Sequence, residues 1–229
     1  MTNTDQTVAT EKSKGPRRLR SEQRRREILE AAMATFGARG YRNGSLGEIA
    51  DQVGITHAGI LHHFGSKNQL LLEVLDYRDE ADVEQLEGRH PPEGMPLFRH
   101  LVDTARNNTT RPGIVQTYAV LSADSVTDDH PAQDYFRTRF TGLRSMIARS
   151  LAQICNPDAM PSDAAIDTAA SAIIGVMDGL QVQWLLDDRA VDLPDATAFA
   201  IDAILTALVA GRTGQRLGAS TPPDETPHR

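Results

Sequence analysis

Apolar residues recur along most of the chain at the three- to four-residue spacing of helices, and nowhere alternate with period two over a useful length. The longest single-faced stripe covers residues 136–154. Two very apolar helical stretches follow it, at about 163–186 and 195–210. This pattern predicts an all-α protein without a β-sheet.

The N-terminal part of the chain divides into shorter helical segments. One runs from Ser21 to Gly40, a residue suited to a left-handed helix cap. Ser45 opens a second with the capping-box sequence Ser-Leu-Gly-Glu, in which serine and glutamate satisfy free backbone N–H groups. A third covers about 56–64, and Ser66 opens a longer fourth helix.

The predicted architecture is an N-terminal three-helix head and a larger C-terminal helical domain. We expect a disordered basic arm over 1–20, a head over 21–67 and a C-terminal domain over 68–212. Residues 213–229 contain several prolines and are expected to form a disordered tail. The proline- and glycine-rich segment 88–96 is the expected hinge.

Charge is distributed unevenly between these parts. The 229 residues carry a formal net charge of −7, yet residues 1–67 hold 11 Lys and Arg against 7 Asp and Glu. A basic N-terminal third on an acidic body leaves one end suited to a phosphate backbone. We see no signal peptide and no apolar run near the ~18 residues of a membrane span, so a cytoplasmic protein without membrane contact is expected. The single cysteine, Cys155, excludes an intrachain disulfide and a cysteine metal cluster, and no cofactor is predicted.

Residues 46–64 meet the demands of a helix-turn-helix. Two short helices that cross closely need one small residue, here Ala50, and a turn residue that tolerates positive φ, here Gly54. Apolar residues must join the pair, and they stand at the required spacing: Ile49, Val53, Ile55 and Ile60. The second helix of such a pair enters the major groove of DNA.

Helical periodicity turns Ile60 and Phe64 inward. It leaves these residues outside or at the helix start: Thr56, His57, Ala58, Gly59, His62 and His63. The first three are the expected base readers, Gly59 permits close approach, and Ser45 and Lys67 suit phosphate contact at helix starts. His57 and His62 lie about 140° apart around the helix, so a shared metal ligand face is not expected.

The chain resembles TetR-family transcriptional regulators. The matching pieces, in order, are residues 28–32, 36–41, 48–56 and 63–67. This resemblance implies DNA contacts by Ser45, Thr56, His57, His63 and Lys67, and a homodimer formed by the last two long helices. It also implies nine to ten helices and a small-molecule effector. Two departures matter: Leu61 replaces a tyrosine that usually reaches phosphate, and Gly47 replaces a common arginine.

The C-terminal helix pair has more apolar surface than one small core requires. A four-helix subunit interface is our preferred interpretation, with packing inside one chain as the alternative. Polar residues within apolar stripes are candidate ligand contacts, although each could bond a neighbouring backbone group instead. The set comprises Phe98, His100, Gln116, Tyr118, Asp124, Phe140, Arg144, Asp178, Gln181 and Trp184.

The predicted function is a sequence-specific regulator, a one-component repressor released from a palindromic double-stranded DNA operator by its effector. The alternatives are a helical enzyme and a non-specific nucleic-acid-coating protein. Against an enzyme stands the lack of a nucleophile elbow, phosphate loop or metal motif in the sequence. The arginines of residues 17–26 fit either a solvated helix face or phosphate contact.

Overall fold

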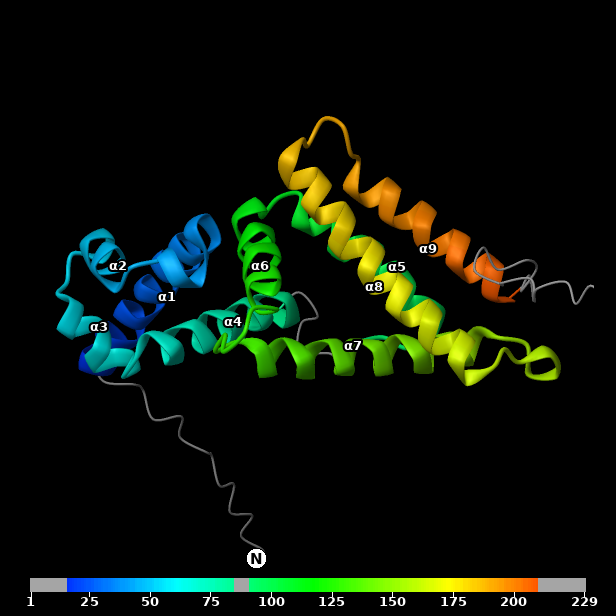
Figure 1. Ribbon diagram of the computed structural model, residues 1–229, viewed down its shortest axis with the longest axis horizontal. Coiled ribbons are helices and arrows are strands. Elements are labelled where there is room, and N and C mark those ends of the chain that lie inside the picture. The colour runs from blue at the N-terminus through cyan, green and yellow to red at the C-terminus, as the bar shows by residue number, and fades with distance from the viewer. Residues whose placement is uncertain (1–15, 85–90, 210–229) are drawn as a thin grey trace, which may run out of the picture.

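The computed structural model describes residues 16–84 and 91–209, and over these ranges it contains nine α-helices, one 3-10 helix and no strand (Figure 1). The all-α prediction is confirmed. The expected tail at 213–229, most of the expected arm and the first third of the expected hinge, residues 88–90, lie outside the described residues.

The head is built by α1 (Pro16–Asn43), α2 (Leu46–Val53), α3 (His57–Phe64) and the first turns of α4 (Lys67–Glu84). Its core is fully buried and includes Ile28, Phe36, Ile49, Ile60 and Leu71. Helix α1 already begins at Pro16, so residues 16–20 are helical and the prediction of a disordered arm up to residue 20 is wrong there. Proline suits a first helical turn because the N–H it lacks would have no helical partner.

Gly40 bends α1 and does not end it. Its φ of +71° is left-handed as predicted, but ψ is 171°, and the helix resumes through Asn43. A Cβ at this position would lie 2.5 Å from Asp124 Oδ2, and the same oxygen accepts a 3.0 Å hydrogen bond from the Tyr41 backbone N–H. Glycine is therefore required both by the backbone angle and by this close approach.

The body contains α5 (Met95–Asn108), α6 (Pro112–Asp124), α7 (Gln133–Ile154), α8 (Asp163–Leu186) and α9 (Leu193–Val209), with the short helix η1 (Pro157–Ala159) before α8. A second core joins α5, α7, α8 and α9. By length and composition alone α8 could cross a membrane, contrary to the sequence expectation. In the fold it packs along α7 and α9 (Figure 1).

Head and body are joined by close packing of α1 against α6. Gly37 lies so near α6 that a Cβ there would be 2.5 Å from Thr117 Oγ1. The Thr117 hydroxyl lies 3.0 Å from the Met33 carbonyl oxygen and 2.8 Å from that of Gly113. The side chain of Thr117 on α6 thus packs directly against the backbone of α1.

Candidate nucleic-acid interface and ligand cavity

Helices α2 and α3 nest as the spacing of small residues predicts. Ala50 is 2% exposed at their crossing, and its carbonyl accepts a 3.0 Å hydrogen bond from the Ile55 N–H. Gly54 caps α2 in the left-handed region, at φ 67° and ψ 39°. With Ile60 and Phe64 buried beneath it, α3 presents His57, Ala58 and His62 to solvent.

Two hydroxyl residues fix where these short helices begin. Ser45 Oγ accepts a 3.1 Å hydrogen bond from the Gly47 N–H, and Thr56 Oγ1 accepts one of 3.1 Å from the Gly59 N–H. Both side chains remain exposed. Each hydroxyl keeps its own proton for a phosphate or base acceptor, so capping and DNA contact are compatible roles.

The other predicted contact residues differ in accessibility. His63 is half-buried and its carbonyl oxygen accepts a 2.8 Å hydrogen bond from Arg25. Burial lowers the pKa of His63, and the neighbouring His62, Arg25 and Arg24 lower it further, so His63 is neutral at pH 7. Lys67 is also half-buried: Nζ donates to the Arg42 carbonyl at 3.2 Å and lies 4.6 Å from the Tyr41 ring centroid.

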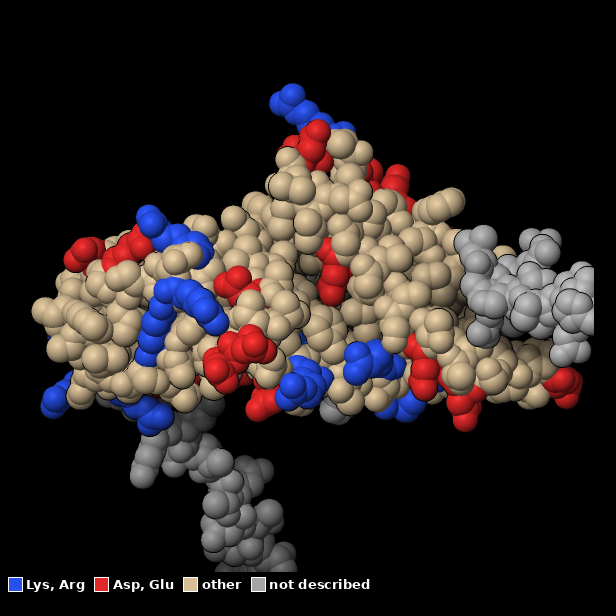
Figure 2. Space-filling model, in the orientation of Figure 1, with Lys and Arg blue, Asp and Glu red and all other residues tan. Residues whose placement is uncertain are grey.

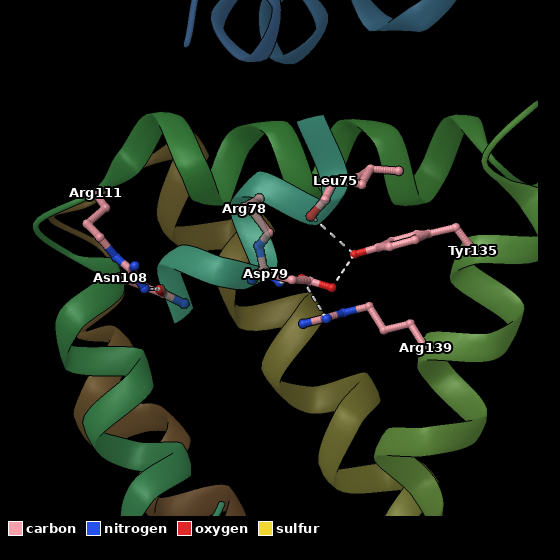
Figure 3. Close-up of polar contacts among 7 residues, drawn as sticks. All are labelled: Leu75, Arg78, Asp79, Asn108, Arg111, Tyr135 and Arg139. Carbon is pink, nitrogen blue, oxygen red and sulfur yellow. Dashed lines mark hydrogen bonds and ion pairs between the residues drawn. The ribbon is translucent and has the colours of Figure 1, made fainter. Parts of the chain in front are cut away.

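Asp79 forms the polar centre of the body (Figure 3). Its Oδ1 accepts from Arg78 at 3.0 Å and from Arg139 at 2.7 Å, while its Oδ2 accepts from the Tyr135 hydroxyl at 2.5 Å. Burial and this hydrogen bond raise the pKa of Tyr135 far above its ordinary value, so the phenol remains a donor. One guanidinium group, that of Arg139, and one phenol, that of Tyr135, therefore tie α7 to the end of α4.

Two of the cavities near this centre share a wall. An inner cavity of about 330 Å³ lies among α4, α5, α6, α7 and α8, and an outer one of about 600 Å³ lies among α6, α7 and α8. Tyr118, Asp178 and Gln181 line both and form the wall between them. Both volumes fall in the range of small-molecule sites. Figure 2 shows the hollow between α6 and α8 with an acidic side chain inside it.

Half of the predicted ligand residues reach these cavities. His100 lines the inner one and Phe140 the outer one, in addition to the three residues of the shared wall. Burial raises the pKa of Asp178 to about 6, and the positive charges of Arg139 and Arg78 only partly oppose this.

The remaining five predicted ligand residues line neither cavity. Phe98 and Trp184 are buried within apolar clusters, and Gln116 and Arg144 are exposed. Asp124 is turned toward α1, where it accepts from the Tyr41 N–H. Helical periodicity distinguishes the inner face of a helix from the outer one, but it does not distinguish a cavity wall from solid core.

The sequence reasoning missed the charged groups of the inner cavity, which are Arg78, Asp79 and Arg139. One signal was available: Arg78 follows Leu71, Val74 and Leu75 at core spacing, and its side chain is only 7% exposed. A charge within an apolar stripe needs a buried partner. Its partner Asp79 is adjacent in sequence, but Arg139 is 60 residues from Asp79.

An exposed short helix presented by a helix-turn-helix, on a body with a ligand-sized cavity, defines a DNA-binding regulatory protein. Two family models match the chain: "Bacterial regulatory proteins, tetR family" over residues 28–74 and "BetI-type transcriptional repressor, C-terminal" over residues 101–210. Together they cover about two thirds of it. The chain belongs to the TetR family of transcriptional regulators. Such regulators bind DNA operators and small-molecule effectors, typically as dimers, and are not enzymes.

Individual relatives agree with this assignment. The chain is 29% identical over 202 residues to the HTH-type transcriptional regulator BetI of Agrobacterium fabrum, a match covering 84% of this chain and 92% of BetI. The crystal structure of NalD, the secondary repressor of the MexAB-OprM multidrug efflux pump in Pseudomonas aeruginosa, matches with a TM-score of 0.63 at 20% identity. That match covers 83% of this chain and 98% of NalD. A SmeT–triclosan complex matches with a TM-score of 0.66 at 18% identity, covering 90% of this chain and all of SmeT.

Proposed function

We propose that this protein is a cytoplasmic repressor that binds a palindromic operator as a homodimer and leaves it when a small molecule occupies the body. The supporting observation is that α4 runs from the head to the inner cavity. Its first residue, Lys67, hydrogen-bonds to the head, and Arg78 and Asp79 of the same helix line the inner cavity. At 1.5 Å per residue the two contacts lie about 17 Å apart on one helix.

This arrangement gives the effector a physical route to the head. A ligand in the inner cavity lies beside the contacts between Asp79 and Arg139, and displacement of either group moves the end of α4. Asp124 offers a second route, because it lies between residues that line the outer cavity and accepts from Tyr41 of the head. The effector can shift the equilibrium between the DNA-binding state and the released state only by the difference in its affinity for the two.

Homodimer formation through α8 and α9 is supported by the apolar side chains that these helices leave exposed. Val182, Leu186 and Phe199 are 45%, 82% and 78% exposed. Gly175 and Gly179 of α8 have open space where a Cβ would lie, which permits another helix to approach closely. A second copy would cover these groups and set two heads about one DNA turn, ~34 Å, apart.

At each half-site α3 would enter the major groove. Thr56, His57 and Ala58 would read bases there, with Gly59 and His62 beside them. Ser45, His63 and Lys67 would contact phosphate, Lys67 after releasing the Arg42 carbonyl. Hydrogen bonds to phosphate position the protein, and contacts with base edges supply specificity.

Operator selection tests the DNA-binding part of this proposal. Wild-type protein is incubated with a random duplex library, and bound DNA is amplified and sequenced over several rounds. We expect one palindrome to be enriched, and His57→Ala to bind it at least ten-fold more weakly while Thr110→Ala, an exposed body substitution, binds normally. Enrichment of no sequence by the wild type would refute specific recognition and favour the coating-protein alternative.

A thermal-shift screen tests the cavity. Compounds that raise the melting temperature of the wild type are retested on Leu143→Trp, which fills the inner cavity, and on Met160→Trp, whose side chain is exposed outside both cavities. An effector should stabilise the wild type and Met160→Trp but not Leu143→Trp, and it should weaken operator binding. Compounds that stabilise all three proteins equally would show that the effector site lies elsewhere.

A further inference from the structure

The first turns of α1 carry three arginines on one face. Arg17, Arg20 and Arg24 are separated by three and four residues, so they form a row along the helix, which we call the arginine row. The row extends into residues 16–20, where the sequence alone predicted a disordered arm, and its members are therefore held by a regular helix.

Arg24 shows which way this row faces. Its guanidinium donates a 2.9 Å hydrogen bond to the carbonyl oxygen of Val53, immediately before the turn into α3, and pairs with Glu27 at 2.9 Å. The face of α1 that bears the arginine row is therefore the face toward the helix-turn-helix.

Arg25 holds the same helix against the other end of α3. It donates to the His63 carbonyl at 2.8 Å, forms an ion pair with Glu73 and stacks 4.3 Å from the centroid of the Phe64 ring. With Arg24 near the start of α3 and Arg25 near its end, the direction of α1 relative to α3 is set by contacts within the head.

Arg17 and Arg20 extend beyond this anchored part. Both are exposed, and neither pairs with a carboxylate among the residues whose side chains the structure describes, 17–79 and 91–208. Arg18 differs, because it pairs with Glu22 at 3.2 Å. At 1.5 Å per residue, Arg17 lies about 10 Å further along the axis than Arg24. In Figure 1 α1 starts at the end of the head that also carries α3 and the start of α4, and Figure 2 shows basic side chains along that edge.

We propose that Arg17 and Arg20 form a second DNA contact, binding backbone phosphates beside the major groove that α3 enters. Guanidinium groups bind phosphate oxygens through paired N–H donors, and these two have no competing carboxylate in the described chain. Because they stand on a helix already fixed to the head, little backbone entropy is lost on binding. This inference rests on the proposed function.

The arginine row also explains how the head can hold DNA despite its departures from the family pattern. Leu61 and Gly47 stand where the resemblance leads one to expect a tyrosine and an arginine that reach the backbone. In this proposal, two arginines in each protomer supply contacts with the DNA backbone from another helix in place of these two. The row adds affinity without sequence preference, since phosphates carry no base information.

The test measures how operator affinity depends on salt. The selected operator is titrated with full-length wild type, with Arg17→Gln/Arg20→Gln and with Arg99→Gln/Arg149→Gln at several potassium chloride concentrations between 50 and 200 mM. The last variant removes the same charge from exposed arginines of the body. Each phosphate contact contributes about 0.9 to the slope of log affinity against log salt. A dimer lacking four contacts should lose about 3.6 from this slope, so wild type should lose ~100-fold more affinity than the variant across this range.

The result that would overturn the inference is a slope in Arg17→Gln/Arg20→Gln equal to that of wild type or of the body control. Hydroxyl-radical footprinting of wild type gives a second readout that needs no mutation. DNA backbone positions beside each major-groove contact should be protected, and a lack of this protection would also overturn the inference. Arg17→Lys/Arg20→Lys should restore most of the slope. An acidic protein partner for the row would leave the slope unchanged. Failure of wild type to select any operator would instead refute the proposed function.

Discussion

The helix-turn-helix and the body make their polar contacts over very different sequence distances. In the head, Ser45 and Thr56 each cap a helix through an N–H two or three residues away, and Gly54 turns the chain between α2 and α3. In the body, Asp79 joins Arg78 to Tyr135 and Arg139, which are 56 and 60 residues away from it. The reading surface therefore follows from local spacing, whereas the cavity depends on how distant helices meet.

This difference matters for function because the two parts must be coupled. Tyr41 occupies the junction: its backbone N–H binds Asp124 of α6, its ring lies edge-on to His130 at 5.2 Å, and its other side is covered by Lys67. The hydroxyl of Tyr41 also bonds Asn68 at the start of α4. Through Tyr41 the head is thus held against α6 and α4, and residues of both helices line the cavities.

The largest effect should come from breaking the long-range centre of the body. Asp79→Ala leaves Arg78 and Arg139, with side chains 7% and 21% exposed, without their shared carboxylate. Loss of one partner from a buried charge group costs about 3–5 kcal/mol. We expect a loss of about 4 kcal/mol in the free energy of unfolding by urea. Asp103→Ala, which breaks an exposed pair with Arg106, should cost under ~1 kcal/mol. Equal costs for both would contradict a central role for Asp79.

The second effect concerns the carboxyl group between the two cavities. The folded-state pKa of Asp178 is about 6 against an ordinary 3.8, so folding favours its protonated form. The associated stability is present below pH 3.8, is lost as pH rises to 6, and is absent at neutral pH. Asp178→Asn should therefore stabilise the protein at pH 7.5 by on the order of 2 kcal/mol, allowing for screening, and have little effect at pH 4.

Urea unfolding at both pH values measures this change. Asp167→Asn on the exposed side of the same helix is the matched control and should show no such pH dependence. A stabilisation by Asp178→Asn that is the same at pH 4 and pH 7.5 would mean that the carboxylate is well solvated in the folded protein.

The stability of the head should depend on the backbone angle at the turn between α2 and α3. Gly54 and Gly113 both have open space for a Cβ, but only Gly54 has positive φ, at 67°. Gly54→Ala should cost about 1–2 kcal/mol, because left-handed backbone is strained for other residues. Gly113→Ala, in the first turn of α6, should be neutral or stabilising by up to ~1 kcal/mol. Equal melting temperatures of the two variants would remove the special role of the turn.

The smallest expected effect is a gain in operator affinity. Leu61 is 36% exposed on α3, at a position where the family resemblance implies a phosphate-binding tyrosine. Leu61→Tyr should strengthen operator binding about five-fold, since a hydrogen bond to a charged group contributes ~1 kcal/mol or more. Leu61→Phe supplies the ring without the hydroxyl and should not strengthen binding. Operator affinities of the two variants are compared by gel shift at fixed salt. An equal gain in affinity from both variants would mean that packing of the ring, and not the hydroxyl, strengthens binding.

Much of the architecture could be predicted from residue spacing. The bounds of α2 and α8, the turn at Gly54 and the caps at Ser45 and Ser66 follow from local rules, and the structure confirms them. The same rules found Asp178 and Gln181 as polar residues on an apolar helix, and both line the cavities. They failed for Trp184 on that helix, which packs against Ala105, Val115 and Leu193.

Residue spacing alone predicts most of the helices, the helix-turn-helix and the face of α3 that remains free, because capping, turn angle and apolar periodicity act between near neighbours. The packing of distant helices sets which polar groups meet in the body, where the body stays hollow, and that Asp124 contacts the head. These outcomes depend on how helices far apart in sequence cross, and the side chains that set each crossing are not adjacent along the chain.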